Sequence, residues 1–249
     1  MKLTLAEPRL LKESVGILAE LVNEATFKID KDRIEVVAMD PANVAMVIFK
    51  LLSSAFVEYE VGKKLSLSVS IDSLNQILKR AKPTDTLILE HDEKKNRLTV
   101  QLRGQSTRTF HLALIDLDET EQKIPDLKFP VTIEMPSLVF NDAIEDMDVI
   151  AESVALVAES EKFTVESEGR LHAGKVEMLT DEGLTIRLTG ATKAAAKYSV
   201  EYLKKIIKGS RLAETMQLSF NQDYPLAVEY KVLDKLLLRF ILAPRVDNT

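Results

Sequence analysis

One stretch of about twenty residues occurs twice in this chain, at a separation of 129 positions. Val69–Leu89 and Tyr198–Leu218 align without a gap, and both combine apolar residues at helical spacing with a basic end. The aligned pairs are Ser70 and Ser199, Ile71 and Val200, Leu74 and Leu203, Ile77 and Ile206, Lys79 and Lys208, Lys82 and Arg211, Asp85 and Glu214. Each copy therefore predicts a short amphipathic helix followed by a strand.

The segments around these helices repeat as well. Pro8 and Pro136 each follow an alternating strand-like segment and precede an apolar stripe at helical spacing. The predicted stripes are Leu11, Val15, Leu18 and Val22 in the first half and Val139, Ala143, Met147 and Ile150 in the second. A hairpin follows each stripe, formed by residues 25–29 with 33–39 and by 153–158 with 162–168. The sequence predicts an α+β protein built by tandem duplication, with antiparallel sheets and two helices in each half.

Residues 115–130 interrupt the repeat, because they are acidic, contain two prolines and show no regular period. We predict a first domain over 1–114, a connecting linker over 115–130 and a second domain over 131–249. The duplication by itself leaves two possibilities open: a site in the crevice between the halves, or a surface on which repeats assemble.

Several kinds of chemistry are excluded or disfavoured by what the sequence lacks. There is no cysteine, which excludes disulfides and thiolate sites and favours a reducing, intracellular location in the cytoplasm or nucleoid. No apolar run is long enough for a bilayer, and no nucleotide or zinc-protease motif is present. His91, His111 and His172 are scattered, and an exposed linker explains Asp116, Asp118, Glu119 and Glu121 better than a cation site does. We predict a protein that is not an enzyme, with no catalytic residues, metal or cofactor.

Positive charge is concentrated in the repeated helices, although the net charge is −6. A basic surface on an acidic protein favours binding of phosphate groups. No aromatic residue is interleaved with these lysines, so base stacking is not indicated and we expect contacts with a phosphate backbone that do not depend on sequence. The candidate residues are Lys12, Lys79, Arg80, Lys82, Lys204, Lys205, Lys208 and Arg211.

Four further segments resemble a known family. Met39–Val47, Asp116–Phe129, Asp223–Tyr230 and Leu242–Val246 are similar to the sliding clamp PCNA, the proliferating cell nuclear antigen, of the archaeal type. The resemblance covers the whole chain. It implies a DNA polymerase processivity factor, a homotrimeric ring around duplex DNA with helices inside and sheets outside, and an ATP-dependent clamp loader that opens the ring.

The resemblance also implies two protein-binding surfaces. Short hydrophobic peptide motifs of DNA polymerase, flap endonuclease and DNA ligase would bind a pocket formed by Met39, Asn43, Val44, Met46, Ile124, Pro125, Phe129, Pro225, Ala243, Pro244, Arg245 and Val246. Edge strands of neighbouring subunits would pair through Arg108, Thr109, Phe110 and His111 on one side and Lys175, Val176, Glu177 and Met178 on the other. Such pairing would cover strand edges that otherwise promote aggregation.

One helix departs from the family pattern. Residues 137–150 carry Asp142, Glu145, Asp146 and Asp148 and no lysine or arginine, so the positive field around DNA would be uneven. Two alternatives remain: a subunit of a heterotrimeric clamp, and a two-domain enzyme with its site between the duplicated halves.

Overall fold

The computed structural model describes residues 1–117, 122–180 and 183–245. The chain forms two compact units. Unit 1 contains Met1–Pro41, Val47–Ile124 and Val232–Leu238, and unit 2 contains Ala42–Met46, Pro125–Lys231 and the chain from Arg239 onward. Each unit therefore includes a short segment from the other half of the sequence. The domain boundaries expected from the sequence stay a prediction.

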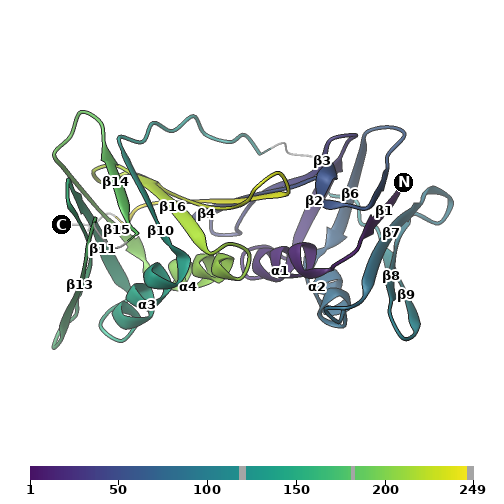
Figure 1. Cartoon of the computed structure of the whole chain (residues 1–249), viewed down its shortest axis with the longest axis horizontal. Coiled ribbons are helices and arrows are strands. Elements are labelled where there is room, and N and C mark those ends of the chain that lie inside the picture. The colour runs from purple at the N-terminus through teal and green to yellow at the C-terminus, as the bar shows by residue number, and fades with distance from the viewer. Residues whose placement is uncertain (118–121, 181–182, 246–249) are drawn as a thin grey trace. The chain divides into compact units, whose positions relative to one another are not determined.

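The first half of the chain follows the predicted order of strands and helices (Figure 1). Its elements are β1 (Lys2–Leu5), α1 (Arg9–Leu18), β2 (Glu24–Ile29), β3 (Arg33–Met39), β4 (Ala45–Leu52), β5 (Glu58–Glu60), β6 (Leu65–Ser70), α2 (Ile71–Lys79), β7 (Thr86–Asp92), β8 (Arg97–Arg103) and β9 (Thr107–Ala113). Ser70 caps α2, because its hydroxyl accepts the N–H of Ser73 at 3.2 Å. The short strand β5 was not expected from the sequence.

Two antiparallel sheets and two helices make up unit 1. One sheet has the order β5-β1-β7-β8-β9, so β9 is an edge strand. In the other sheet β3, β2 and β6 are consecutive neighbours. Helices α1 and α2 lie side by side (Figure 1), and the predicted stripe of α1 is buried at Leu11, Val15 and Leu18. The first basic helix, α2, buries Ile71, Leu74 and Leu78 and leaves Asp72, Gln76 and Lys79 at the surface.

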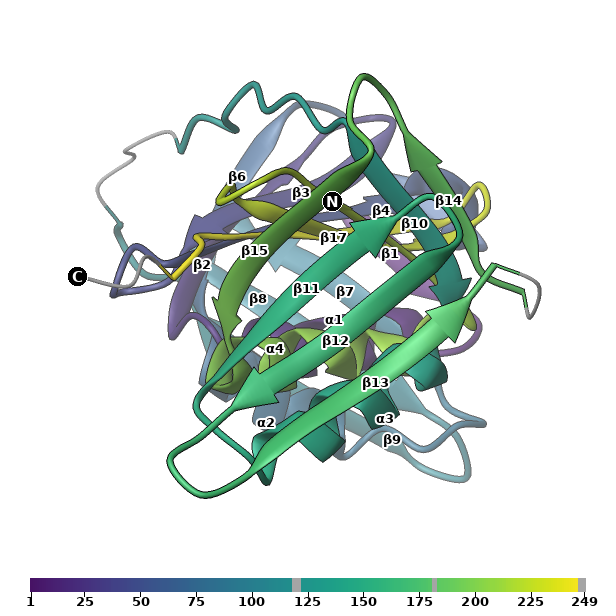
Figure 2. The ribbon, with the colours of Figure 1, turned by 90° about the vertical axis from the view of Figure 1, so that its left-hand side faces the viewer.

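The second half repeats this order from the start of the second domain. Its elements are β10 (Val131–Pro136), α3 (Ser137–Asp148), β11 (Ser153–Glu159), β12 (Lys162–Glu168), β13 (Ala173–Leu179), β14 (Thr185–Leu188), β15 (Lys193–Ser199), α4 (Val200–Ile206), the 3-10 helix η3 (Ile207–Arg211), β16 (Thr215–Phe220), β17 (Leu226–Val232) and β18 (Leu236–Leu242). In unit 2 the strands β15, β11, β12 and β13 form a sheet with α3 and α4 against one face (Figure 2). Strand β13 is an edge strand of that sheet.

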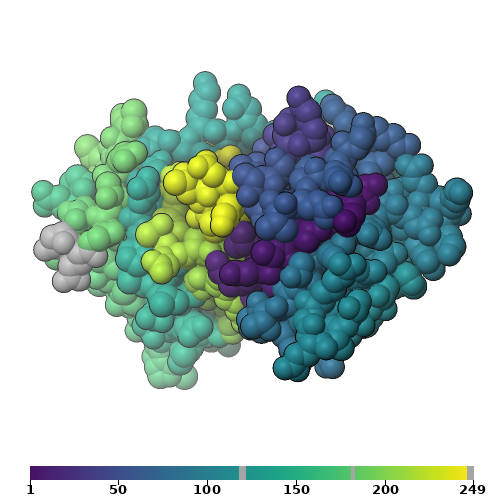
Figure 3. All heavy atoms as spheres, turned by 45° about the vertical axis from the view of Figure 1, so that its right-hand side comes forward, coloured from purple at the N-terminus to yellow at the C-terminus, as the bar shows by residue number. Residues whose placement is uncertain are grey.

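The turn between β17 and β18 belongs to unit 1. Its backbone is tied to the segment after β4, since the N–H of Leu52 donates to the carbonyl of Lys235 at 2.8 Å and the hydroxyl of Ser54 donates to the carbonyl of Asp234. Figure 3 shows this turn in yellow against the blue surface of that segment. The end of the chain therefore contributes directly to the first unit.

The predicted apolar stripe of α3 was wrong at its first position. Val139 is 42% exposed, and the buried residues of this helix are Phe140, Ala143, Ile144 and Met147. These residues match the buried face of α1 at an offset of 129, whereas the two prolines are 128 apart. Pro8 already has helical dihedrals, but Pro136 is extended and ends β10. The helical register is therefore set by the buried face and not by the proline.

Candidate functional site

The basic residues of unit 1 lie at the end of α2 and in the turn that follows. Lys79 is in the last turn of α2, and Lys79, Arg80 and Lys82 are all exposed. Lys12 is different, because its side chain is half-buried on α1 and its ammonium donates to the carbonyl of Ala81 at 2.8 Å. Three of the four predicted residues are thus exposed to solvent, whereas the side chain of Lys12 points to the backbone of the turn after α2.

The basic residues of unit 2 lie on α4 and η3. The apolar face predicted for this helix is buried at Val200, Leu203, Ile206 and Ile207. Lys204 is exposed and pairs with Asp148 of α3 at 2.5 Å. Lys205 pairs with Glu201 at 3.2 Å and lies 5.0 Å from the centre of the Tyr202 ring. Lys208 and Arg211 follow on η3. These lysines are therefore partly compensated by carboxylates on the same unit.

The acidic side chains of α3 are exposed. Asp142, Glu145, Asp146 and Asp148 all lie at the surface of this helix, beside α4. The pair between Asp148 and Lys204 joins the acidic helix to the basic one. The helical surface of unit 2 consequently carries both signs of charge.

Most of the residues predicted to form the peptide pocket belong to unit 2. The chain after β18 lies against the loop before β4, because the N–H of Ala243 donates to the carbonyl of Val44 at 2.9 Å. Asn43, in the same loop, has a positive φ of 57°. Ala243 and Arg245 are exposed, while Val44 and Pro244 are half-buried. Two segments distant in the sequence thus form one continuous surface.

The linker contributes an aromatic contact to this part of unit 2. The rings of Phe129 and Tyr224 meet edge to face with centroids 6.0 Å apart, next to Pro225. The hydroxyl of Tyr198 donates to the carbonyl of Tyr224 at 2.6 Å, and burial raises the pKa of Tyr198. The N–H of Arg245 donates to the carbonyl of Lys197 at 2.7 Å. These bonds fix the loop before β17 and the chain after β18 relative to β15.

The remaining pocket residues are placed differently. Met46 is only 3% exposed and lies within β4, and Pro125 is exposed. Met39 and Ile124 belong to unit 1, where Ile124 is 42% exposed. Val246 lies outside the described residues, as do Asp118, Glu119 and Glu121 of the acidic linker.

The predicted subunit-pairing residues lie on two edge strands with the same alternation of exposure. Thr109 and His111 of β9 and Lys175 and Glu177 of β13 are exposed. Their neighbours Arg108, Phe110, Val176 and Met178 are half-buried and point to the other side of their sheets. His111 hydrogen-bonds across to Thr99 at 3.1 Å. Both strands present one open backbone edge, which is the geometry that strand pairing requires.

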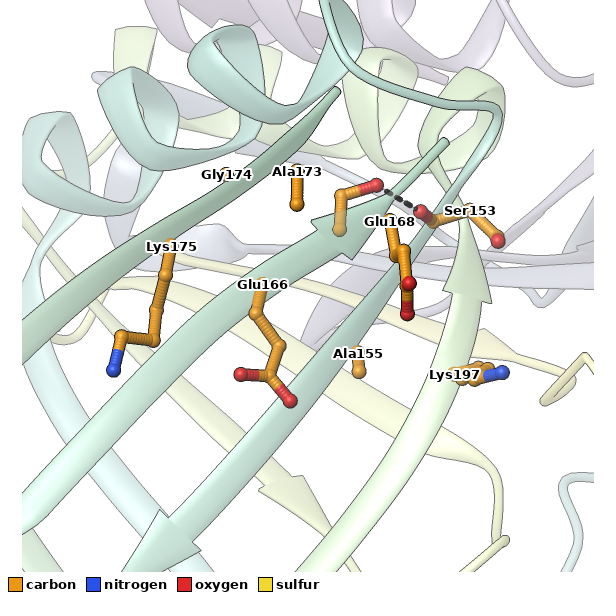
Figure 4. Close-up of a pocket in the computed structure, with 9 residues that line it drawn as sticks. Ser153, Ala155, Glu166, Glu168, Ala173, Gly174, Lys175 and Lys197 are labelled. Atoms are coloured by element: carbon orange, nitrogen blue, oxygen red, sulfur yellow. Dashed lines mark hydrogen bonds between the residues drawn. The ribbon is translucent and has the colours of Figure 1, made fainter. Parts of the chain in front are cut away.

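A groove of about 390 Å³ lies on the open face of the β15-β11-β12-β13 sheet (Figure 4). Its lining residues are Ser153, Ala155, Glu166, Ser167, Glu168, Ala173, Gly174, Lys175 and Lys197. The hydroxyl of Ser167 donates to the carbonyl of Ser153 at 2.6 Å, and no histidine lines the groove to act as a base. These side chains do not form a catalytic arrangement. All of them belong to unit 2.

The described residues contain neither a helix long and apolar enough to cross a membrane nor a group of three acidic or histidine side chains that could hold a metal ion.

Comparison with known proteins identifies the family. The model of the proliferating cell nuclear antigen N-terminal domain matches residues 1–122, and that of its C-terminal domain matches residues 123–245. The chain belongs to the PCNA family. The resemblance and the clamp fold predicted from the sequence are therefore confirmed. At the level of the family, so is the prediction of a sliding clamp that is not an enzyme.

Similar PCNA-family proteins come from archaea. The chain is 36% identical to a DNA polymerase sliding clamp of Nanoarchaeum equitans, over 99% of this chain and 100% of that protein. It is 37% identical to a DNA polymerase sliding clamp of Pyrococcus furiosus, over 94% of each. The crystal structure of PCNA from Thermococcus kodakaraensis superposes with a TM-score of 0.92 and 28% identity, covering 98% of this chain and 99% of that one. A chain of the PCNA2-PCNA3 complex from Sulfolobus tokodaii shares the fold, with a TM-score of 0.90 at 24% identity.

The sequence did not indicate what Arg108 and Asp85 do. Arg108 was assigned to subunit pairing, but its guanidinium forms an ion pair with Asp85 of the same unit and donates to the carbonyl of Arg80 at 2.8 Å. The available signal was an aspartate three residues after Lys82 in a helix-to-strand turn, which is a local capping pattern.

Proposed function

We propose that three copies of this chain close head to tail into a ring around duplex DNA. The protein is a DNA polymerase sliding clamp, a processivity factor without enzymatic activity. Because a closed ring is held on DNA by topology, each phosphate contact can be weak, and weak contacts permit sliding. A clamp of this kind acts inside the cell, in the cytoplasm or nucleoid. A separate ATP-dependent clamp loader opens the ring.

One observation carries this proposal beyond the family relationship. Both copies of the repeated helix bury their apolar face and keep basic residues at the surface, in a chain whose net charge is −6. An acidic protein that holds cations at equivalent places in two domains is suited to a polyanion that both domains meet. Duplex DNA in the centre of the ring meets this condition, and contacts with its backbone carry no sequence information.

The ring closes through the two edge strands. Strand β9 of one copy pairs with β13 of the next copy. Each copy therefore uses two open edges, β9 in one contact and β13 in the other. A heterologous contact that closes on itself produces a cyclic oligomer. Backbone pairing between Arg108–His111 and Lys175–Met178 covers the open edges of β9 and β13 in the assembled ring.

Client proteins bind to the surface made by the loop before β4, the linker and the chain after β18. DNA polymerase, flap endonuclease and DNA ligase each insert a short peptide with apolar anchors into this surface. Val44, Phe129 and Pro244 are half-buried side chains of separate segments, which supports a shallow apolar pocket with a polar rim. Arg245 and Asn43 supply the rim.

Retention on closed circular DNA tests the clamp function. The chain is loaded on a nicked circular plasmid, separated from free protein, and measured again after a restriction enzyme linearises the DNA. A sliding ring stays on the circular plasmid and slides off the ends of the linearised DNA. The variant with Lys79, Arg80, Lys204, Lys205 and Lys208 changed to Ala should load poorly while its fold is intact. Equal retention on circular and linear DNA would contradict the proposal.

Calorimetry with a client peptide tests the pocket. Pro244→Glu should weaken binding at least about tenfold, because it places a charge against an apolar anchor. Lys231→Glu, an exposed residue on β17, is the matched control and should bind normally. Normal affinity in the Pro244 variant would move the peptide surface elsewhere.

A further inference from the structure

The turn between α2 and β7 is held by a buried carboxylate. The side chain of Asp85 is only 2% exposed, and its Oδ2 accepts the N–H of Lys82 at 2.7 Å. This bond, with the Arg108 guanidinium beside it, holds the pKa of Asp85 below its usual value. A buried carboxylate needs such partners, since an unpaired charge in the interior is strongly unfavourable. Asp85 is therefore an ionised anchor at the base of the turn.

Two cations from other elements reach the same turn. Arg108 of β9 pairs with Asp85 through one nitrogen and donates to the carbonyl of Arg80 through another, at 2.8 Å. Lys12 of α1 donates to the next carbonyl, that of Ala81, at 2.8 Å. Both carbonyls follow directly after α2, where backbone acceptors lack helical partners and the helix dipole is negative. The two side chains, from β9 and α1, therefore supply donors to the end of this helix.

The β8–β9 hairpin closes over the carboxylate. A Cβ atom added to Gly104 would lie 2.2 Å from Oδ1 of Asp85, so only glycine fits there. Gly104 and Arg108 belong to the same hairpin, and β9 contacts α2. The conformation of the turn is thus fixed by α1, by the hairpin and by its own aspartate.

The basic side chains of this segment lie at the surface. Lys79, Arg80 and Lys82 are exposed. The direction of these side chains depends on the backbone of the turn, whose carbonyls accept hydrogen bonds from Arg108 and Lys12. We propose that Arg108 is a positioning residue, with Lys12 in support, which holds the α2–β7 turn so that Lys79, Arg80 and Lys82 face the phosphate backbone. This inference rests on the proposed DNA contact of these three residues.

The proposal changes the role of Arg108 within the edge strand. The backbone of β9 remains open for pairing with another subunit, but the guanidinium is occupied within its own unit. We therefore expect loss of this side chain to affect DNA binding more than assembly.

Amide hydrogen exchange on the full chain provides the test. The amide of Lys82 reports the turn directly, because its N–H is bound by Asp85. Arg108→Gln should accelerate exchange at Lys82 by about tenfold or more, since hydrogen bonds to charged groups are the strong ones. Arg103→Gln is the matched control, because it removes the same charge from an exposed position of the same hairpin and should leave Lys82 unchanged. Lys12→Gln tests the turn from α1 if the Arg108 variant fails to fold.

Binding of a short linear duplex across a salt series completes the experiment. The salt slope of the association constant should fall by about one or more in Arg108→Gln and stay constant in Arg103→Gln, because each phosphate contact contributes about one. Light scattering on the same samples should show an unchanged mass.

The outcomes separate the two proposals. Unchanged exchange at Lys82 would overturn the positioning role, and a loss of mass in the same variant would assign Arg108 to the subunit boundary instead. Faster exchange with an unchanged salt slope would overturn the link to DNA. A wild-type protein that does not bind duplex DNA at all would refute the proposed function, but it would not refute the finding that Arg108 holds the α2–β7 turn.

Discussion

The two copies of the repeated helix end in turns that are fastened in different ways. In unit 1 the turn after α2 is held by charge, through Asp85, Arg108 and Lys12. In unit 2 the equivalent segment, η3, is closely packed, since Gly209 lies against the fully buried ring of Tyr230. Neutral hydrogen bonds accompany this packing: the amide of Asn141 donates to the hydroxyl of Ser210 at 2.8 Å, and the hydroxyl of Ser137 donates to the carbonyl of Ala213 at 2.8 Å.

Aligned positions show how the difference arose. At the offset of 129, Arg80 corresponds to Gly209, Arg108 to Leu237 and Lys12 to Asn141. The two anchoring cations, Arg108 and Lys12, thus correspond to neutral residues, whereas Asp85 corresponds to the acidic Glu214 and Lys79 to the basic Lys208. The comparison shows that this fold can hold the turn either by ion pairs or by packing with neutral hydrogen bonds, while Lys79 and Lys82 keep basic counterparts in Lys208 and Arg211.

The largest effect on the free energy of unfolding is expected at Gly209, where the packing leaves no space for a side chain. A Cβ atom at Gly209 would lie 2.2 Å from a ring carbon of Tyr230, so Gly209→Ala should lower the free energy of unfolding by about 3 kcal/mol. Gly16→Ala on α1 is the control, because its Cβ would lie 3.7 Å from the nearest atom, and it should raise stability by up to about 1 kcal/mol. Denaturant unfolding measures both. Equal effects of the two substitutions on stability would show that the tight packing of Gly209 against Tyr230 does not hold this turn.

Acid should loosen only the ionic turn. The N–H of Lys82, and then Arg108, lower the pKa of Asp85, so the stabilisation is present above the pKa of an unfolded aspartate, about 3.9, and is lost as pH falls through the lower folded value. The advantage of the wild type over Asp85→Asn in urea should be constant above about pH 5 and shrink below about pH 4. An advantage that persists undiminished at pH 2 would contradict the ionic account.

The smallest effect on stability is expected at the hydrogen bond between Asn141 and Ser210 in unit 2. Asn141→Ala removes the donor to Ser210 and should lower the free energy of unfolding by about 1 kcal/mol. Asp142→Ala, at the next and exposed position of α3, should change it by less than about 0.5 kcal/mol. A larger loss at Asp142 than at Asn141 would show that α3 is fastened through its acidic face.

The architecture was predictable from the sequence because its signals are local and occur twice. Alternating strands and the apolar faces of α1, α2 and α4 follow directly from side-chain periodicity. The stripe of α3 was wrong at Val139, one residue before the buried Phe140, since the extended Pro136 shifts the proline relative to the buried face. Strand β5 is three residues long and has no period to detect.

The candidate site was predictable only in part. The exposed positions of Lys79, Arg80 and Lys82 follow from the amphipathic pattern, and the peptide surface came from motif resemblance. The inward direction of Lys12 and the pair between Asp85 and Arg108 depend on residues 23 positions or more apart. Such contacts are set by tertiary packing and leave no mark in a local pattern.

The native mass of the purified chain across a concentration series tests the central claim most directly, because encirclement of DNA and pairing of β9 with β13 both require the ring. Light scattering should give a stable mass near three times 27.9 kDa. Thr109→Pro, which removes a backbone donor from β9, should reduce the mass to that of one chain. A wild-type monomer or dimer at every concentration would contradict the homotrimeric ring and indicate a subunit of a heterotrimeric clamp.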